Sequence, residues 1–174
     1  VLSERLEGDV GYVRLKQFQA TSSAEISEAL DVLKSRGPLR GLVLDLRGNP
    51  GGLLEQAAKV SDLFIDRGTI VATVGHSEGR EEKKASAAGT EPPYPMVVLV
   101  DGSSASASEI VAGALKNLNR AVIVGQTTFG KGSVQLVFPE ITPDKAALKL
   151  TIAQYLTPGD RSIQGVGVTP HIEL

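Results

Sequence analysis

The chain has 174 residues, of which 41% are hydrophobic and 22% charged, and its formal net charge is −2. This length suits one domain, and the composition excludes wholesale disorder. The nearly balanced charge, with no clustered basic stretch, argues against nucleic acid as a partner. The absence of cysteine excludes disulfides and thiolate chemistry. With only two histidines, His76 and His171, we expect no histidine-rich metal site. We expect no cofactor either.

The amino terminus gives no targeting signal. Its first residues, Val1-Leu2-Ser3-Glu4, do not form a signal peptide and do not begin with Met. No apolar run approaches the roughly 18 residues that cross a membrane. We expect the sequence to be a single-domain piece of a longer protein.

The predicted elements alternate between strands and helices. In chain order they are a strand at 10–16 with Val10 and Tyr12 turned inward and Val13 and Leu15 as further inward candidates, a helix from Ser22 or Ser23 to Gly37-Pro38, a strand at 41–46, a helix that ends at Gly68 and a strand at 69–74. The first helix has apolar residues at i, i+3, i+4 and i+7, and the strand at 41–46 is the continuous apolar run of a strand buried on both faces.

The second half continues this alternation after a polar segment, 75–95, which we expect to be a solvated loop. The elements that follow are a strand at 96–100, a helix at about 106–119, strands at 121–124, 133–138 and 148–155, and irregular chain at 157–170. Strands that alternate with helices imply βαβ units, so we predict an α/β fold with a mostly parallel sheet flanked by helices.

A glycine-rich motif, Arg47-Gly48-Asn49-Pro50-Gly51-Gly52, joins a buried strand to a helix. Successive glycines let backbone N–H groups approach a ligand, and the following helix N-terminus favours developing negative charge. A tight βα turn with no further role explains the same residues.

A serine-rich motif, 102–109, follows the strand at 96–100 and opens the third predicted helix. A turn of small residues there presents a serine oxygen at the carboxyl end of the sheet, where open α/β folds hold ligands. The neighbouring N–H groups could hold an oxyanion. Ser106 and Glu109 also match a capping box, which would make the serine purely structural.

A lysine between two glycines, Lys131 in the loop 127–132, is the third motif. An ammonium enclosed in apolar surroundings loses its proton more readily, and a neutral amine beside a serine hydroxyl can act as a general base. An exposed loop lysine is the alternative. The loop is not a phosphate-binding Walker A motif, because Gly132 stands where Ser or Thr is required.

A Ser–His–Asp triad is the rival arrangement for the serine. His76 lies in the polar segment and His171 near the carboxyl end, and neither has a placed carboxylate partner. A Ser–Lys pair needs only one base and fits the motifs better.

Together these motifs resemble the carboxyl-terminal processing (tail-specific) proteases, serine/lysine peptidases with a crotonase-like (ClpP/crotonase) β/α core. The resemblance runs over essentially the whole chain, through Gly11–Leu15 with Phe18, Leu44–Leu54, Ser104–Ala114, Gly125–Gln135, and Tyr155–Pro158 with Ser162–Gly165. Each segment alone is a weak indication of the family, but all of them in this order are highly specific for it.

The resemblance assigns a role to individual residues. It implies Ser106 as the nucleophile, Lys131 as the general base and Gln135 as the orienting partner of the lysine. The oxyanion donors would be the backbone N–H groups of Ala107 and Gly52, with Gly51 as the alternative to Gly52. Some members carry an aspartate in the third helix where this chain has Asn117, so we assign that position no catalytic role.

The resemblance also implies a setting for the enzyme. Such proteases cleave proteins near their C-termini, usually with a preceding PDZ domain, and act in a periplasm, cell envelope or thylakoid lumen. No PDZ domain is recognisable in residues 1–174, so we expect weak or absent activity from these residues alone. The oligomeric state and an activating partner or adaptor remain open. Two other functions are retained, a non-catalytic peptide-binding or scaffold module and a crotonase-type acyl-CoA enzyme.

Overall fold

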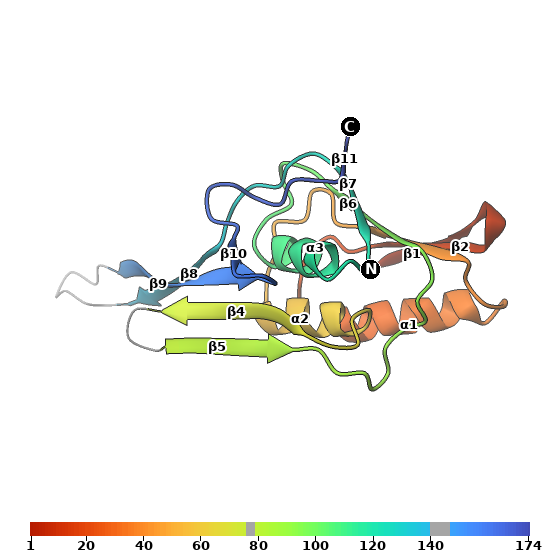
Figure 1. Ribbon diagram of the computed structural model, residues 1–174, viewed down its shortest axis with the longest axis horizontal. Helices are drawn as coiled ribbons and strands as arrows, with labels where there is room; N and C mark the ends of the chain where they lie inside the picture. The colour runs from red at the N-terminus through yellow and green to blue at the C-terminus, as the bar shows by residue number, and fades with distance from the viewer. Residues whose placement is uncertain (76–78, 140–146) are drawn as a thin grey trace.

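The computed structural model describes residues 1–75, 79–139 and 147–174. Its main sheet has the strand order β1-β2-β3-β6-β7-β11 (Figure 1). The strands are β1 (Leu2–Leu6), β2 (Val10–Arg14), β3 (Gly41–Asp45), β6 (Met96–Val100), β7 (Val122–Gly125) and β11 (Ile172–Glu173). Strand β1 runs antiparallel to β2, and every other neighbouring pair of this sheet is parallel.

A second sheet has the order β10-β9-β4-β5, with β8 also paired to β9. Its strands are β4 (Thr69–Gly75), β5 (Gly79–Lys84), β8 (Ser133–Phe138), β9 (Leu148–Thr157) and β10 (Arg161–Ser162). All its pairs are antiparallel. The predicted α/β class is therefore confirmed, while the mostly parallel pairing holds for the main sheet only.

Three α-helices occur in the described part of the chain: α1 (Ser22–Lys34), α2 (Leu54–Asp62) and α3 (Ala107–Asn117), besides the short 3-10 helix η1 (Glu7–Asp9). Helix α1 buries the predicted apolar face. Helix α2 ends earlier than predicted, because a turn replaces helical bonding at residues 63–64. None of these helices is long and apolar enough to cross a membrane.

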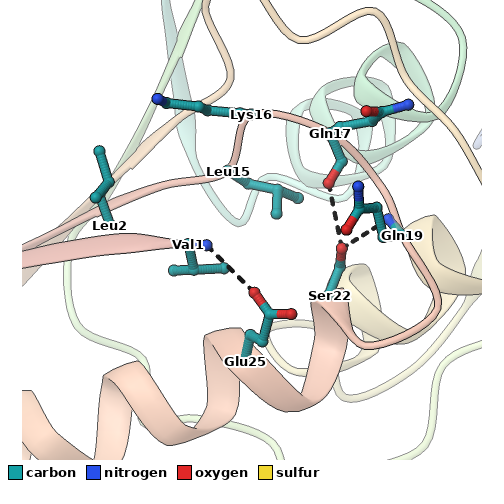
Figure 2. Close-up of a pocket in the computed structure, with 8 residues that line it drawn as sticks. All are labelled: Val1, Leu2, Leu15, Lys16, Gln17, Gln19, Ser22 and Glu25. Carbon is teal, nitrogen blue, oxygen red and sulfur yellow. Dashed lines mark hydrogen bonds and ion pairs between the residues drawn. The ribbon is translucent and has the colours of Figure 1, made fainter.

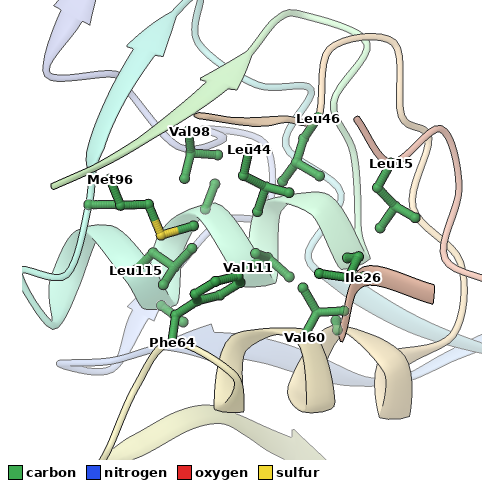
Figure 3. Packing of buried hydrophobic residues seen from close by; sticks show 14 of the residues in the cluster. Leu15, Ile26, Leu44, Leu46, Val60, Phe64, Met96, Val98, Val111 and Leu115 are labelled. Carbon is green, nitrogen blue, oxygen red and sulfur yellow. The ribbon is translucent and has the colours of Figure 1, made fainter. Parts of the chain in front are cut away.

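Helix α3 lies in the centre of the core (Figure 3). Val111 and Leu115 are completely buried, with Phe64 in the turn after α2 beside them and Leu44 and Val98 of the main sheet above them. Burying one such side chain contributes about 1.5–3 kcal/mol. Contacts with α2, β4, β7 and β9 hold α3 rigidly, and with it the turn that precedes the helix.

The segment 75–95, expected to be a solvated loop, contains strand β5, which forms an antiparallel hairpin with β4. Its residues, Gly79–Lys84, are nearly all charged, and such composition is typical of an exposed edge strand that must not pair with another chain. Strands β1, β10 and β11 were not predicted either. Val13 in β2 and Leu15 just after it are buried, as two of the inward candidates, whereas Val10 and Tyr12 are only half-buried.

Candidate active site

The glycine-rich and serine-rich turns meet at one edge of the main sheet. They follow β3 and β6, which are parallel neighbours, and the carboxyl ends of parallel strands share an edge. The backbone oxygen of Asn49 accepts hydrogen bonds from Ala105 N (3.0 Å) and Ser108 Oγ (2.9 Å). The Gly48 N–H donates to the Asp101 carboxylate at 3.0 Å. These bonds fix the two turns against each other.

Ser106 immediately precedes α3 in a strained backbone conformation. Its φ of 55° and ψ of −112° are rare for a residue with a side chain and cost on the order of 1–3 kcal/mol. The residue is half-buried, and its N–H donates to Glu109 Oε2 at 2.8 Å. The half of the predicted capping box in which the Ser106 N–H donates to Glu109 is therefore present, while the Ser106 hydroxyl makes no capping hydrogen bond. Strain of this kind is typical of functional sites and is not needed for a helix cap.

Two backbone N–H groups in the glycine-rich and serine-rich turns have no acceptor in the described part of the chain, those of Gly52 and Ala107. The Gly51 N–H differs, because it donates to the buried Asn49 side chain at 2.9 Å. Within the described residues the N–H groups of Gly52 and Ala107 are therefore free donors, whereas that of Gly51 is already occupied. Their role in holding an oxyanion stays a prediction.

Phe18 holds the glycine-rich turn from the other side. Its N–H donates to Gly51 O (2.9 Å) and its oxygen accepts from Leu53 N (3.0 Å). The turn that carries Phe18 is fixed by Ser22, whose Oγ accepts from Gln19 N at 2.8 Å and donates to Gln17 O at 3.2 Å (Figure 2). A pocket of about 280 Å³ opens beside this turn, and none of the predicted site residues lines it.

Lys131 is presented by the third loop with its side chain exposed. Its N–H donates to Glu109 Oε2 at 2.8 Å. Within the described residues no hydrogen bond joins Lys131 Nζ to Ser106 Oγ, so the enclosed amine of the sequence prediction is not the arrangement seen. Gln135 is also exposed, and its Nε2 lies 3.5 Å from Thr151 Oγ1. The roles of Lys131 and Gln135 stay predictions.

Asp45, at the end of β3, anchors the start of the glycine-rich turn. Its buried carboxylate accepts from Arg47 Nε (2.9 Å), Arg47 Nη2 (2.7 Å) and Tyr12 Oη (2.6 Å). Burial alone would raise the pKa of Asp45, but the hydrogen bonds from Arg47 and Tyr12 outweigh it and hold the pKa below its usual value.

The histidines give no support to a Ser–His–Asp triad. His76 lies outside the described residues, and His171 Nδ1 accepts the backbone N–H of Ile123 in β7 at 3.0 Å. Asn117 bonds to Thr157 through its side chain. In the parts of the chain that the structure describes, no three acidic, histidine or cysteine side chains gather as a metal site.

Three residues whose hydrogen bonds hold these turns were assigned no role from the sequence: Asn49, Asp101 and Thr128. Asn49 and Thr128 are buried polar residues, and Asp101 accepts three backbone N–H groups. Their position in turns between strands and helices was the available signal, but turn residues of these types are common. Only the long-range partners show their role.

Comparisons with known proteins agree on one family. Residues 9–174 match peptidase family S41. The carboxy-terminal-processing protease of Bartonella bacilliformis is 48% identical over an alignment that covers 97% of this chain and 39% of that protein. The carboxy-terminal processing protease CtpA of Bacillus subtilis is 38% identical over an alignment that covers 99% of this chain and 36% of that protein.

A solved structure, the photosystem II D1 C-terminal processing protease, superposes with a TM-score of 0.85 at 37% identity and covers 97% of this chain and 44% of that one. The chain thus spans roughly two fifths of the length of these relatives. From the match over 166 of its 174 residues (9 to 174 inclusive), we conclude that the chain belongs to peptidase family S41.

Proposed function

We propose that the chain is the peptidase core of a C-terminal processing protease, with Ser106 as the nucleophile and Lys131 as the general base. The observation that carries this proposal is the strained Ser106 at the N-terminus of α3, together with the N–H groups of Gly52 and Ala107, which have no acceptor within the described residues. A serine that only caps a helix needs neither the strain nor the free donors.

The reaction begins as the neutral amine of Lys131 takes the proton of Ser106 Oγ, which bonds to the substrate's carbonyl carbon. The carbonyl electron pair moves to its oxygen, and the N–H groups of Gly52 and Ala107 hold that oxyanion. Collapse breaks the C–N bond, and the leaving amine receives the proton from Lys131. Water then attacks the acyl ester in the same way, which releases the acid and restores Ser106.

Catalysis requires Lys131 Nζ to come within about 3 Å of Ser106 Oγ. The backbone of Lys131 is held by Glu109, so the approach would come from rotation of the exposed Lys131 side chain. Gln135, four residues further along, is proposed to orient the amine in that closed arrangement.

The finer features of the proposal rest on the relatives and the resemblance. We propose the crotonase-like form of the α/β fold, supported by the parallel strands β2, β3, β6 and β7 whose carboxyl ends carry the site. Substrate proteins would be cut near their C-termini, as the names of the relatives suggest. Delivery by a PDZ domain is proposed on the resemblance alone. Export is proposed as well, and one relative, from Tetradesmus obliquus, is named as chloroplastic.

A fluorophosphonate probe tests the catalytic pair, since only an activated serine reacts with it. We expect wild-type chain to be labelled at Ser106, and the variants Ser106→Ala and Lys131→Arg to be unlabelled, because a guanidinium does not release its proton near neutral pH. Ser103→Ala, in the same turn, and Lys59→Arg, on the surface of α2, are matched controls that should react normally.

The same experiment separates the alternative functions. A folded wild-type chain that resists the probe while binding peptides would support a scaffold module instead. Stabilisation by acyl-CoA without labelling would support the acyl-CoA enzyme. Hydrolysis of a peptide substrate by the wild type, lost in Ser106→Ala, would exclude both.

A further inference from the structure

We infer that Glu109 is a positioning residue whose buried carboxylate couples the turn that carries Ser106 to the loop that carries Lys131 (127–132, the base loop). This inference rests on the proposed function, since it concerns how Ser106 and Lys131 are held relative to each other. Glu109 lies in the first turn of α3 and is completely buried. It forms no salt bridge within the described residues.

Four hydrogen-bond donors converge on this carboxylate. Oε2 accepts the backbone N–H groups of Ser106 and Lys131, each at 2.8 Å. Oε1 accepts the N–H of Gly130 at 2.7 Å and the hydroxyl of Thr128 at 2.6 Å. An ionised carboxylate has about four acceptor sites, so the donors fill its capacity. One oxygen atom thus joins the backbone of the proposed nucleophile directly to that of the proposed base.

The donors also replace an ion-pair partner. A buried charge is tolerated only when hydrogen bonds or an opposite charge stabilise it, and here the three N–H groups, the hydroxyl and the N-terminus of α3 do so. Opening the base loop would therefore leave the carboxylate under-solvated in the core. Glu109 holds the loop closed on the helix, and the position of Lys131 becomes coupled to that of Ser106.

The four hydrogen bonds to the Glu109 carboxylate, which we call the clamp, distinguish glutamate from glutamine. In Glu109→Gln, one oxygen becomes an NH₂ group, which is a donor. Whichever way the amide turns, this group faces at least one backbone N–H, either Gly130 or the pair Ser106 and Lys131. Two donors cannot bond to each other, so the nearly isosteric glutamine breaks the clamp that a mere space-filling residue would preserve.

Thr128 tests the same clamp from its other end. Its hydroxyl donates to Glu109 and accepts the N–H of Val168 at 2.7 Å. Thr128→Val removes the hydroxyl at nearly constant volume, whereas Thr128→Ser retains it. Coupling through Glu109 predicts that valine impairs the site and that serine rescues it.

The experiment measures fluorophosphonate labelling of Ser106 together with hydrogen exchange of the Ser106, Gly130 and Lys131 amides in the full chain. We expect labelling to slow about a hundredfold in Glu109→Gln, as for a displaced catalytic group, and about tenfold in Thr128→Val. The three amides should exchange faster in both variants. Thr128→Ser should behave as wild type. Ile110→Val, a core change at the adjacent buried position, is the control for a loss of stability alone.

The outcomes separate this inference from the proposed function. If the wild type is not labelled, the proposed function fails and the inference fails with it. If the wild type is labelled and Glu109→Gln reacts equally fast, or its Lys131 amide keeps wild-type exchange, the inference alone is overturned. It is also overturned if Ile110→Val slows labelling and speeds exchange of these amides as much as Glu109→Gln does. Should Glu109→Gln not fold, the comparison of Thr128→Val with Thr128→Ser decides alone.

Discussion

Gly51 lies directly against Ser106: a Cβ atom added to Gly51 would lie 2.8 Å from Ser106 Cβ and 2.9 Å from Ala107 N. It would also lie 2.6 Å from the backbone oxygen of Ala105. Real Cβ atoms do not approach so closely, so any side chain at Gly51 displaces the serine turn. The close approach of the two turns therefore depends on this glycine.

Gly51→Ala should destabilise the protein and abolish labelling of Ser106. The φ of +99° at this position disfavours any side chain, and the steric overlap adds a cost, for a total of about 2–5 kcal/mol. Chemical denaturation measures the stability, and the phosphonate probe measures the site. Labelling should be lost even at temperatures where the variant remains folded, because the serine turn has moved.

Gly48→Ala is the matched control in the same turn. Gly48 also has a positive φ, +69°, but an added Cβ meets nothing within 4 Å. Only the backbone cost of about 1–2 kcal/mol should remain, with labelling retained. Equal loss of labelling in both variants would contradict the steric explanation.

Ser106→Gly should yield an inactive protein that is more stable than the wild type. Glycine relieves the backbone strain at φ 55°, and after its larger loss of chain entropy the net gain is about 1 kcal/mol. For a chain of this size, such a gain raises Tm by about 3 °C. Differential scanning calorimetry of the wild type and the variant measures the shift.

Ser106→Ala separates strain from chemistry, because alanine keeps the strained backbone and loses only the hydroxyl. It should be as inactive as Ser106→Gly but show a Tm close to that of the wild type. A Tm of Ser106→Gly at or below that of Ser106→Ala would show that the serine turn is not strained.

The alternation of strands and helices was predictable because the main sheet is built from short-range patterns. The apolar run at β3 reflects burial of both faces of one strand, and the spacing of Ile26, Ala29, Leu30 and Leu33 reflects burial of one face of one helix. The second sheet was harder to anticipate. Strand β5 is almost wholly charged and is a strand only because β4 offers a pairing edge, which no local pattern reveals.

The candidate site, like the fold, could be predicted only where the signal is local in the sequence. Ser106, Lys131 and the glycine-rich turn were identified from motifs that are continuous in the sequence. The partners that assemble them, such as Glu109 with Lys131 or Asn49 with Ala105, are separated by 22 and 56 positions (131 − 109; 105 − 49). Hydrogen bonds between such distant residues depend on the registers of β3 against β6 and of β6 against β7, which the sequence alone does not determine.

Asp45→Asn should reduce stability at neutral pH and flatten its dependence on acid pH. The carboxylate accepts from Arg47 and Tyr12, and weakening hydrogen bonds to a buried charge costs on the order of 2 kcal/mol. Because those bonds hold the pKa of Asp45 below its ordinary value despite burial, its contribution is fully present above the unfolded pKa of about 3.9 and is lost as the pH falls through the folded value. Denaturation curves from pH 7 down to about pH 2 should therefore show the difference between wild type and variant constant at first and shrinking below about pH 4. A difference that stays constant throughout, or widens in acid, would mean that the Asp45 carboxylate is not stabilised by Arg47 and Tyr12, and that the start of the glycine-rich turn is held in some other way.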